Sequence, residues 1–282
     1  MTSNLWRYAQ ASVIGTSHTK LGLPCQDASR CHLIQDASVE PVLLAVVADG
    51  AGSAKRAEVG ALLACDLFLS ETESLLEQGR GVQGVTQEFA RSCLERFQTA
   101  VAVRAEIDGL RSREFACTLL AAIMGIDATV FLQVGDGAIV MSPRKEPKEY
   151  HWVFWPQTGE YENQTTFATD VSAVDNLKYG VAPYAIDDVA LFSDGLQRLA
   201  LHFETRTAHA PFFLPLFEAL RAAPKGGENG LSSSLATFLG SQQINDRTDD
   251  DKTLTLAARR DTIDSTLPKE DEQYRDGDAT GC

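Results

Sequence analysis

The stretch VLLAVVADGAGSAKRAEVGA, from Val42 to Ala61, joins an apolar run to a helix-like segment through an acidic glycine turn. The run 42–48 contains only valine, leucine and alanine, which predicts a strand covered on both faces. It stops at Asp49, and Gly50 begins the turn. Aspartate has poor strand propensity. A buried strand that ends in a carboxylate therefore indicates that this carboxylate binds a partner group.

The segments on either side of this stretch show both helical and strand patterns. Apolar residues at helical spacing predict helices over 57–76, 85–107, 212–221 and 232–243. Runs rich in β-formers predict strands at 5–14, 115–124, 129–134, 138–141, 189–192 and 254–258. Two long helices followed by strands at hairpin spacing predict an α+β fold and not a strict βαβ alternation.

Composition excludes several classes of protein. A chain of 282 residues that is 44% hydrophobic suits one large domain or two small ones. A formal net charge of -14 argues against a nucleic-acid or membrane-surface partner. The chain lacks an apolar run of ~18 residues and a signal-peptide pattern, and its six cysteines form no zinc-type group. We therefore expect a cytoplasmic protein with reduced thiols.

Acids recur where the strand-like runs end. The five concerned are Asp27, Asp49, Asp136, Asp194 and Asp250. A surface turn explains any single Asp-Gly pair. If the strand ends gather at one edge, however, the acids converge, and two carboxylates ~4 Å apart repel by roughly 4 kcal/mol at an effective dielectric of 20. Such a cluster requires cations.

The choice of cation follows from the ligand atoms. Carboxylate oxygens without cysteine or histidine favour Mg²⁺ or Mn²⁺ over zinc, and the chain has only five histidines. The acids therefore predict a site for two or more divalent ions. Sites of this kind commonly act on phosphate esters, by holding the phosphoryl oxygens and ionising a bound water.

Six motifs in order now suggest a family. They are GTSHTKLGLPCQDAS, LLAVVADGAGS, FACTLLAA, FLQVGDGAIV, LFSDGL and DDKTLTLA. This set resembles the metal-dependent type 2C (PPM) protein serine/threonine phosphatases, in particular their bacterial branch, over residues 12–258. The resemblance implies a four-layer αββα sandwich with two central antiparallel sheets. We assign a catalytic domain to 1–261 and a disordered acidic tail to 262–282.

The resemblance also implies roles for the acids. Asp49 would bridge two metals, and the carbonyl of Gly50 would bind the first of them. Asp194 and Asp250 would complete the second. These three aspartates would be catalytic through a metal-bound water. Asp250 is chosen because DDKT fits the family pattern Asp-(Asn/Asp)-x-Thr.

Further acids surround this set in the resemblance. Asp27 would join the cluster directly or through water. Asp136 would help Asp194 to hold a third, weaker metal. The neighbours Asp249 and Asp251 compete with Asp250 for the last ligand position.

The chain departs from the family at two places. Many relatives carry a phosphate-gripping arginine where this chain has Gly22, and His18 or Lys20 could substitute for it. Eukaryotic members have a histidine, thought to be the general acid, where this chain has Ala51. The region 146–170 falls where bacterial relatives carry a mobile flap. It also fits an aromatic hairpin packed on the core.

The function that follows is hydrolysis of phosphoserine or phosphothreonine in proteins, with an opposing kinase as an implied partner. A cysteine-based phosphatase is disfavoured, because no cysteine has an arginine six positions on. A nucleotide-binding oxidoreductase is disfavoured because Lys55 replaces the third glycine of its fingerprint. A non-catalytic phosphatase-fold module that binds a phosphoprotein or senses metal remains the alternative.

Overall fold

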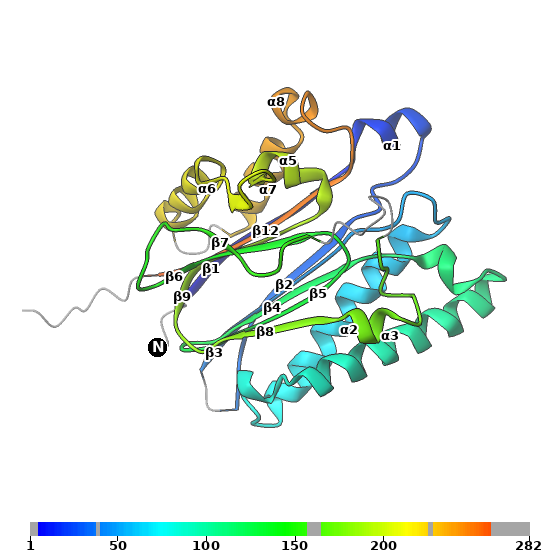
Figure 1. Cartoon of the computed structure of the whole chain (residues 1–282), viewed down its shortest axis with the longest axis horizontal. Coiled ribbons are helices and arrows are strands. Elements are labelled where there is room, and N and C mark those ends of the chain that lie inside the picture. The colour runs from blue at the N-terminus through cyan, green and yellow to red at the C-terminus, as the bar shows by residue number, and fades with distance from the viewer. Residues whose placement is uncertain (1–4, 38–39, 157–164, 225–227, 261–282) are drawn as a thin grey trace, which may run out of the picture.

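Two five-stranded antiparallel sheets lie face to face between two layers of helices (Figure 1). The structure is a computed structural model, and it describes residues 5–37, 40–156, 165–224 and 228–260. The predicted α+β fold and four-layer αββα sandwich are confirmed. The predicted tail at 262–282 lies outside the described residues. No helix in the described ranges is both long and apolar enough to span a bilayer.

The strands are ordered β2-β3-β4-β5-β8 in one sheet and β1-β12-β9-β6-β7 in the other. The first sheet contains β2 (Ala28–Gln35), β3 (Pro41–Ala48), β4 (Leu119–Met124), β5 (Thr129–Val134) and β8 (Lys178–Ala182). The second contains β1 (Trp6–Val13), β12 (Lys252–Arg259), β9 (Ile186–Phe192), β6 (Ala138–Pro143) and β7 (His151–Trp152). A small ribbon pairs β10 (Leu201–His202) with β11 (Thr207–Ala208).

The helices flank the sheets and occupy their ends. The α-helices are α1 (Thr16–Leu21), α2 (Ala57–Glu77), α3 (Gln87–Asp108), α4 (Ala173–Asn176), α5 (Gln197–Ala200), α6 (Ala210–Ala222), α7 (Glu228–Leu239) and α8 (Gln242–Asn245). Three 3₁₀ turns are η1 (Val82–Gly84), η2 (Ser112–Phe115) and η3 (Asp194–Leu196). Figure 1 shows α2 and α3 along one side of the sandwich and α6 and α7 along the other.

The apolar run in β3 is explained by burial on both faces. Val42, Leu44 and Val46 pack into the cluster that contains Phe68 of α2 and Phe97 of α3. The alternate residues Leu43, Ala45 and Val47 pack between the sheets, against residues of β9 and β12. Because successive side chains point to opposite faces, a strand covered by a helix layer and by a second sheet must be apolar throughout.

The second sheet has its own helical cover. Ala190 and Phe192 of β9 pack with Phe213 and Phe217 of α6. Burying a large apolar side chain contributes about 1.5–3 kcal/mol. These three phenylalanines are each fully buried. They therefore hold α6 firmly on the second sheet, whose strand β9 leads into Asp194.

Several predicted boundaries differ from the structure for local reasons. The strand predicted at 115–124 begins only at Leu119, because Phe115 ends a 3₁₀ turn. The helix predicted from 85 begins at Gln87, because the Thr86 side chain accepts a hydrogen bond from the Phe89 amide. The helix predicted at 232–243 is divided into α7 and α8 around Gly240 and Ser241. Strands β2 and β8 were not predicted, since their composition is mixed.

The strand ends gather at one edge, as the acids require. Ala48, the last residue of β3, pairs with Ala28, the first of β2. Phe192, the last of β9, pairs with Ala138 at the start of β6 and with Leu254 near the start of β12. The segments just beyond these ends carry all five predicted acids.

Candidate metal centre

A cavity of about 180 Å³ lies at this edge of the two sheets. Six of the predicted site residues line it: His18, Asp49, Gly50, Asp136, Asp194 and Asp250. The other two, Asp27 and Lys20, are not among its lining residues. No lysine or arginine of the described chain lines it. The structure therefore brings together the acids that the sequence predicted, and Asp27 lies buried within their electrostatic reach.

Asp49 and Gly50 are fixed by hydrogen bonds to the neighbouring strand. The carbonyl of Asp49 accepts from the amide of Thr118 at 2.7 Å, and the amide of Asp49 donates to the Thr118 hydroxyl at 3.1 Å. A Cβ at Gly50 would lie 2.6 Å from the carbonyl oxygen of Gln26. Glycine is thus required here for the close backbone approach that shapes the turn.

Asp27 is buried and only half satisfied. Its Oδ2 accepts from the Ser193 hydroxyl at 2.8 Å, and Ser193 Oγ in turn accepts from the Thr253 amide at 3.0 Å. Its Oδ1 is buried without a hydrogen-bond partner. Burial raises the pKa of Asp27 to about 7, against these hydrogen bonds. An orphaned buried carboxylate oxygen is costly and requires an explanation.

The acids perturb one another. Burial raises the pKa of Asp49 well above its usual range, and the carboxylates of Asp27, Asp194 and Asp136 add to this shift. Burial also raises the pKa of Asp194 to about 6, with further contributions from Asp136 and Asp250. Without a cation, the folded chain thus resists ionisation of Asp49 and Asp194.

Asp136 is held in the turn between β5 and β6. Gly135 before it adopts φ +97°, where an L side chain is strained. The Thr165 hydroxyl donates to Asp136 Oδ2 at 2.5 Å, and the Gln197 side-chain amide donates to the Asp136 carbonyl. Thr165 and Phe167 also line the cavity. The described end of the predicted flap region therefore reaches the site.

The three consecutive acids before β12 differ sharply. Asp251 is 3% exposed and accepts from the amides of Gly15 and Gln26, each at 2.6 Å, and from His18 Nδ1 at 2.9 Å. Asp250 is exposed and lines the cavity. Asp249 offers its carbonyl to the amide of Ser17 at 2.9 Å. Asp250 and Asp251 both line the cavity. The Asp251 carboxylate is occupied by three donors, whereas Asp250 accepts only from the amide of Asp251, at 2.8 Å, among the bonds of the described chain.

The two candidate phosphate-binding residues also separate. His18 is buried and its Nδ1 donates to Asp251, because a carboxylate only accepts. Its Nε2 lies 4.0 Å from where a Cβ on Gly52 would stand. Lys20 is exposed on α1 and does not line the cavity.

Sequence reasoning missed Thr118, Thr165 and the positioning role of Asp251. Threonines within strand-like or loop segments carry no local signal of a partner far along the chain. For Asp251, the run of three acids indicated only that one of them has a role in the site, and not which one. The bonds that distinguish it join residues 225 to 236 positions apart.

A four-layer αββα sandwich with an all-carboxylate cavity at the edge of both sheets defines a class of phosphate-ester hydrolases to which the motifs already pointed. The model of the family described as "Protein phosphatase 2C" matches residues 14–240. The chain belongs to the protein phosphatase 2C family, whose members include protein serine/threonine phosphatases.

One relative is similar over nearly its whole length. Serine/threonine-protein phosphatase 3 of Escherichia coli strain K12 is 37% identical over 252 residues, which is 89% of this chain and 98% of that protein. This places the chain among protein serine/threonine phosphatases.

Solved structures show the same fold. The serine/threonine phosphatase of S. agalactiae has a TM-score of 0.61 at 15% identity, covering 90% of this chain and 99% of that one. The catalytic domain of the phosphatase PstP, described in complex with 2 manganese ions, has a TM-score of 0.57 at 17% identity, covering 91% and 99%.

Proposed function

We propose that this chain hydrolyses phosphoserine and phosphothreonine in cytoplasmic proteins, and that Mn²⁺ or Mg²⁺ completes its site. One observation carries the proposal: Asp49, Asp136, Asp194 and Asp250 line one cavity into which no lysine or arginine of the described chain projects. Because burial and neighbouring carboxylates raise the pKa of Asp49 and of Asp194, divalent cations would stabilise the ionised cluster more than any neutral donor.

The residues fit such ions. All the candidate ligand atoms are oxygens, which magnesium and manganese prefer. Asp49, the Gly50 carbonyl, Asp194 and Asp250 would hold two ions, and Asp136 with Asp194 a third, weaker one. The orphaned Oδ1 of Asp27 would gain a partner in an ion or its water. When bound, the ions supply an ionised water as nucleophile and neutralise phosphoryl charge.

The remaining side chains hold this set and bind substrate. Thr118 fixes the Asp49 backbone, and Thr165 orients the carboxylate of Asp136. His18 is held through Nδ1 by Asp251, and in its doubly protonated form its Nε2 would donate to the phosphoryl group or to the leaving oxygen. This role for His18 replaces the family arginine that is absent at Gly22. Lys20 contributes less, because it is exposed.

The proposed catalytic domain spans residues 1–261, with 146–170 as a flap beside the site. Two features support the flap: Thr165 bonds Asp136, and Phe167 lines the cavity. At its other end, Trp152 and Trp155 pack edge to face, and Trp152 Nε1 donates to the Arg206 carbonyl at 2.8 Å. The two tryptophans are therefore packed, which supports the alternative interpretation of an aromatic hairpin for this part of the region.

The test is turnover of a phosphoserine peptide by the purified chain. We expect hydrolysis that requires Mn²⁺ or Mg²⁺, is abolished by a chelator and is lost in Asp49→Asn. A protein that binds no divalent ion at millimolar supply would instead be the non-catalytic module. Activity that survives both Asp49→Asn and Asp194→Asn would overturn the proposal.

A further inference from the structure

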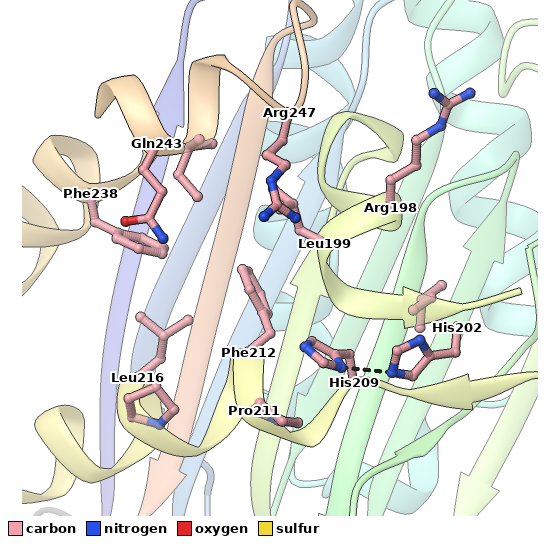
Figure 2. Close-up of a pocket in the computed structure, with 13 residues that line it drawn as sticks. Arg198, Leu199, His202, His209, Pro211, Phe212, Leu216, Phe238, Gln243 and Arg247 are labelled. Atoms are coloured by element: carbon pink, nitrogen blue, oxygen red, sulfur yellow. Dashed lines mark hydrogen bonds between the residues drawn. The ribbon is translucent and has the colours of Figure 1, made fainter.

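A second cavity, of about 640 Å³, lies between α5, α6, α8 and the end of α7 (Figure 2). Apolar side chains form much of its wall, among them Leu199, Phe212, Leu216 and Phe238. Cavities of ~300–1,000 Å³ with apolar walls and a few polar groups are typical ligand sites. None of its residues lines the acidic cavity.

The polar lining has one sign of charge. It includes Arg198, Arg247 and the pair His202 and His209, whose ring nitrogens lie 2.7 Å apart. No aspartate or glutamate of the described chain lines the cavity, although acids outnumber lysine and arginine by 39 to 25 in the whole sequence. A lining without acids in such an acidic chain makes this cavity complementary to an anion.

The guanidinium groups of Arg198 and Arg247 do not stabilise the fold through polar contacts. Most other arginines on the described surface pair with a nearby acid, as Arg30 does with Asp66 and Arg104 with Asp108. Arg198 and Arg247 make no side-chain hydrogen bond or ion pair with the described residues. Figure 2 shows Arg247 extending from the turn after α8 toward Phe212, while Arg198 lies at the margin. Arg247 thus places a free, bidentate donor over the apolar wall.

The cavity is built on the segments that carry two of the proposed ligands. Arg198 and Leu199 belong to α5, which directly follows the 3₁₀ turn beginning at Asp194. On the other side, Lys252 Nζ donates to Asn245 Oδ1 in α8 at 2.9 Å and to the Asp250 carbonyl at 3.2 Å. A ligand here would therefore touch the supports of the acidic centre without entering it.

We propose that this cavity binds a small amphipathic anion, with an aliphatic or aromatic body against Phe212, Leu216 and Phe238 and a single anionic head on Arg247. Arg198 and the histidine pair add weaker polar contacts at the margin. This site goes beyond the phosphatase activity, because nothing in the proposed hydrolysis requires it.

The experiment is calorimetric titration of the full chain in chelator with octanesulfonate, which is an anion on an eight-carbon chain. Chelator removes any metal-held anion site, so the result does not depend on the proposed phosphatase activity. Octanol and octylammonium carry the same chain with a neutral and a cationic head. We expect one octanesulfonate per chain, bound at least ~10-fold more tightly than either, as a charge-assisted hydrogen bond predicts.

Variants locate the site. Arg247→Gln should weaken octanesulfonate binding by ~10-fold or more, and Leu216→Gln should weaken it as well by making the apolar wall polar. Arg91→Gln is the matched control, since Arg91 is exposed on α3 and its side chain makes no hydrogen bond or ion pair with the described residues. Equal affinity for octanol, no binding at all, or an unchanged affinity in Arg247→Gln would each overturn the proposal.

Discussion

The two ends of β9 carry two acids in opposite surroundings. At one end, Asp188 is fully buried, accepts from the guanidinium of Arg221 and receives the Tyr150 hydroxyl at 3.4 Å. At the other, Asp194 faces Asp49, Asp136 and Asp250. Burial raises the pKa of both to about 6, but Arg221 opposes the shift at Asp188 whereas further acids add to it at Asp194.

The difference separates structural acids from functional ones. The chain supplies a cation for Asp188 and three hydrogen-bond donors for Asp251. No lysine or arginine of the described chain lines the cavity that holds Asp49, and Asp27 keeps one unpartnered oxygen. An acid that the fold leaves uncompensated costs stability when it is ionised, so we expect a cation from outside to stabilise the acidic centre at neutral pH.

The largest expected effect is on catalysis at the cavity beyond the Asp194 end of β9, where the acids have no cation of their own. Asp49→Asn should lower Mn²⁺-dependent phosphopeptide turnover by at least ~100-fold, because loss of a proposed metal ligand would remove several kcal/mol of charge stabilisation. The same change should stabilise the metal-free chain against urea, since it removes a repelling carboxyl. Asp66→Asn, on the surface of α2, is the control: it should leave turnover unchanged and should lower stability by no more than about 1 kcal/mol, since it breaks only an exposed ion pair with Arg30. A less stable metal-free Asp49→Asn would contradict the comparison.

The second effect is a dependence of stability on pH without metal. The folded pKa values of Asp27 and Asp194, about 7 and about 6, exceed their ordinary value of 3.8. Their contribution to the free energy of unfolding is therefore fully present below about pH 4 and is lost as pH rises through 6 to 7. We expect a loss of roughly a few kcal/mol over this range.

Mn²⁺ should oppose this loss at pH 7. At 100 times its dissociation constant, a bound ion stabilises the folded chain by about 2.7 kcal/mol, which thermal unfolding with and without chelator would measure. If the free energy of unfolding of the metal-free chain rose from pH 5 to pH 7, this would contradict the conclusion that the acids of the cavity lack a compensating charge.

The third effect tests the other end of β9, where Arg221 compensates the charge of Asp188. Arg221→Met should lower the free energy of unfolding at pH 7 by about 2 kcal/mol. This is less than the ~3–5 kcal/mol typical of a broken buried pair, because the Arg221 side chain is 31% exposed. The loss should shrink at pH 5, where Asp188 is protonated. Adding Asp188→Leu should recover much of the stability, and urea unfolding of the single and double variants would show it.

The smallest effect concerns substrate binding. His18→Gln should raise the KM for a phosphopeptide by ~10-fold, as loss of a hydrogen bond to a charged group predicts. Lys20→Ala should change it by less than ~2-fold, because this lysine is exposed and away from the cavity. If the two variants reverse this order, the lysine grips the phosphate and His18 only supports Asp251.

The sequence by itself determined the strand that opens onto Asp49, the two long helices and the ordered acids, because periodicity and strand-terminal acids are local signals. The same signals could not show that Asp250 and Asp251 line the cavity and that Asp249 and Lys20 do not. Nor could they show that Asp188 has Arg221 as its own cation. Only the tertiary structure decides these points, since each depends on partners that folding brings from distant parts of the chain, 33 positions away for Asp188 and up to 236 for Asp251.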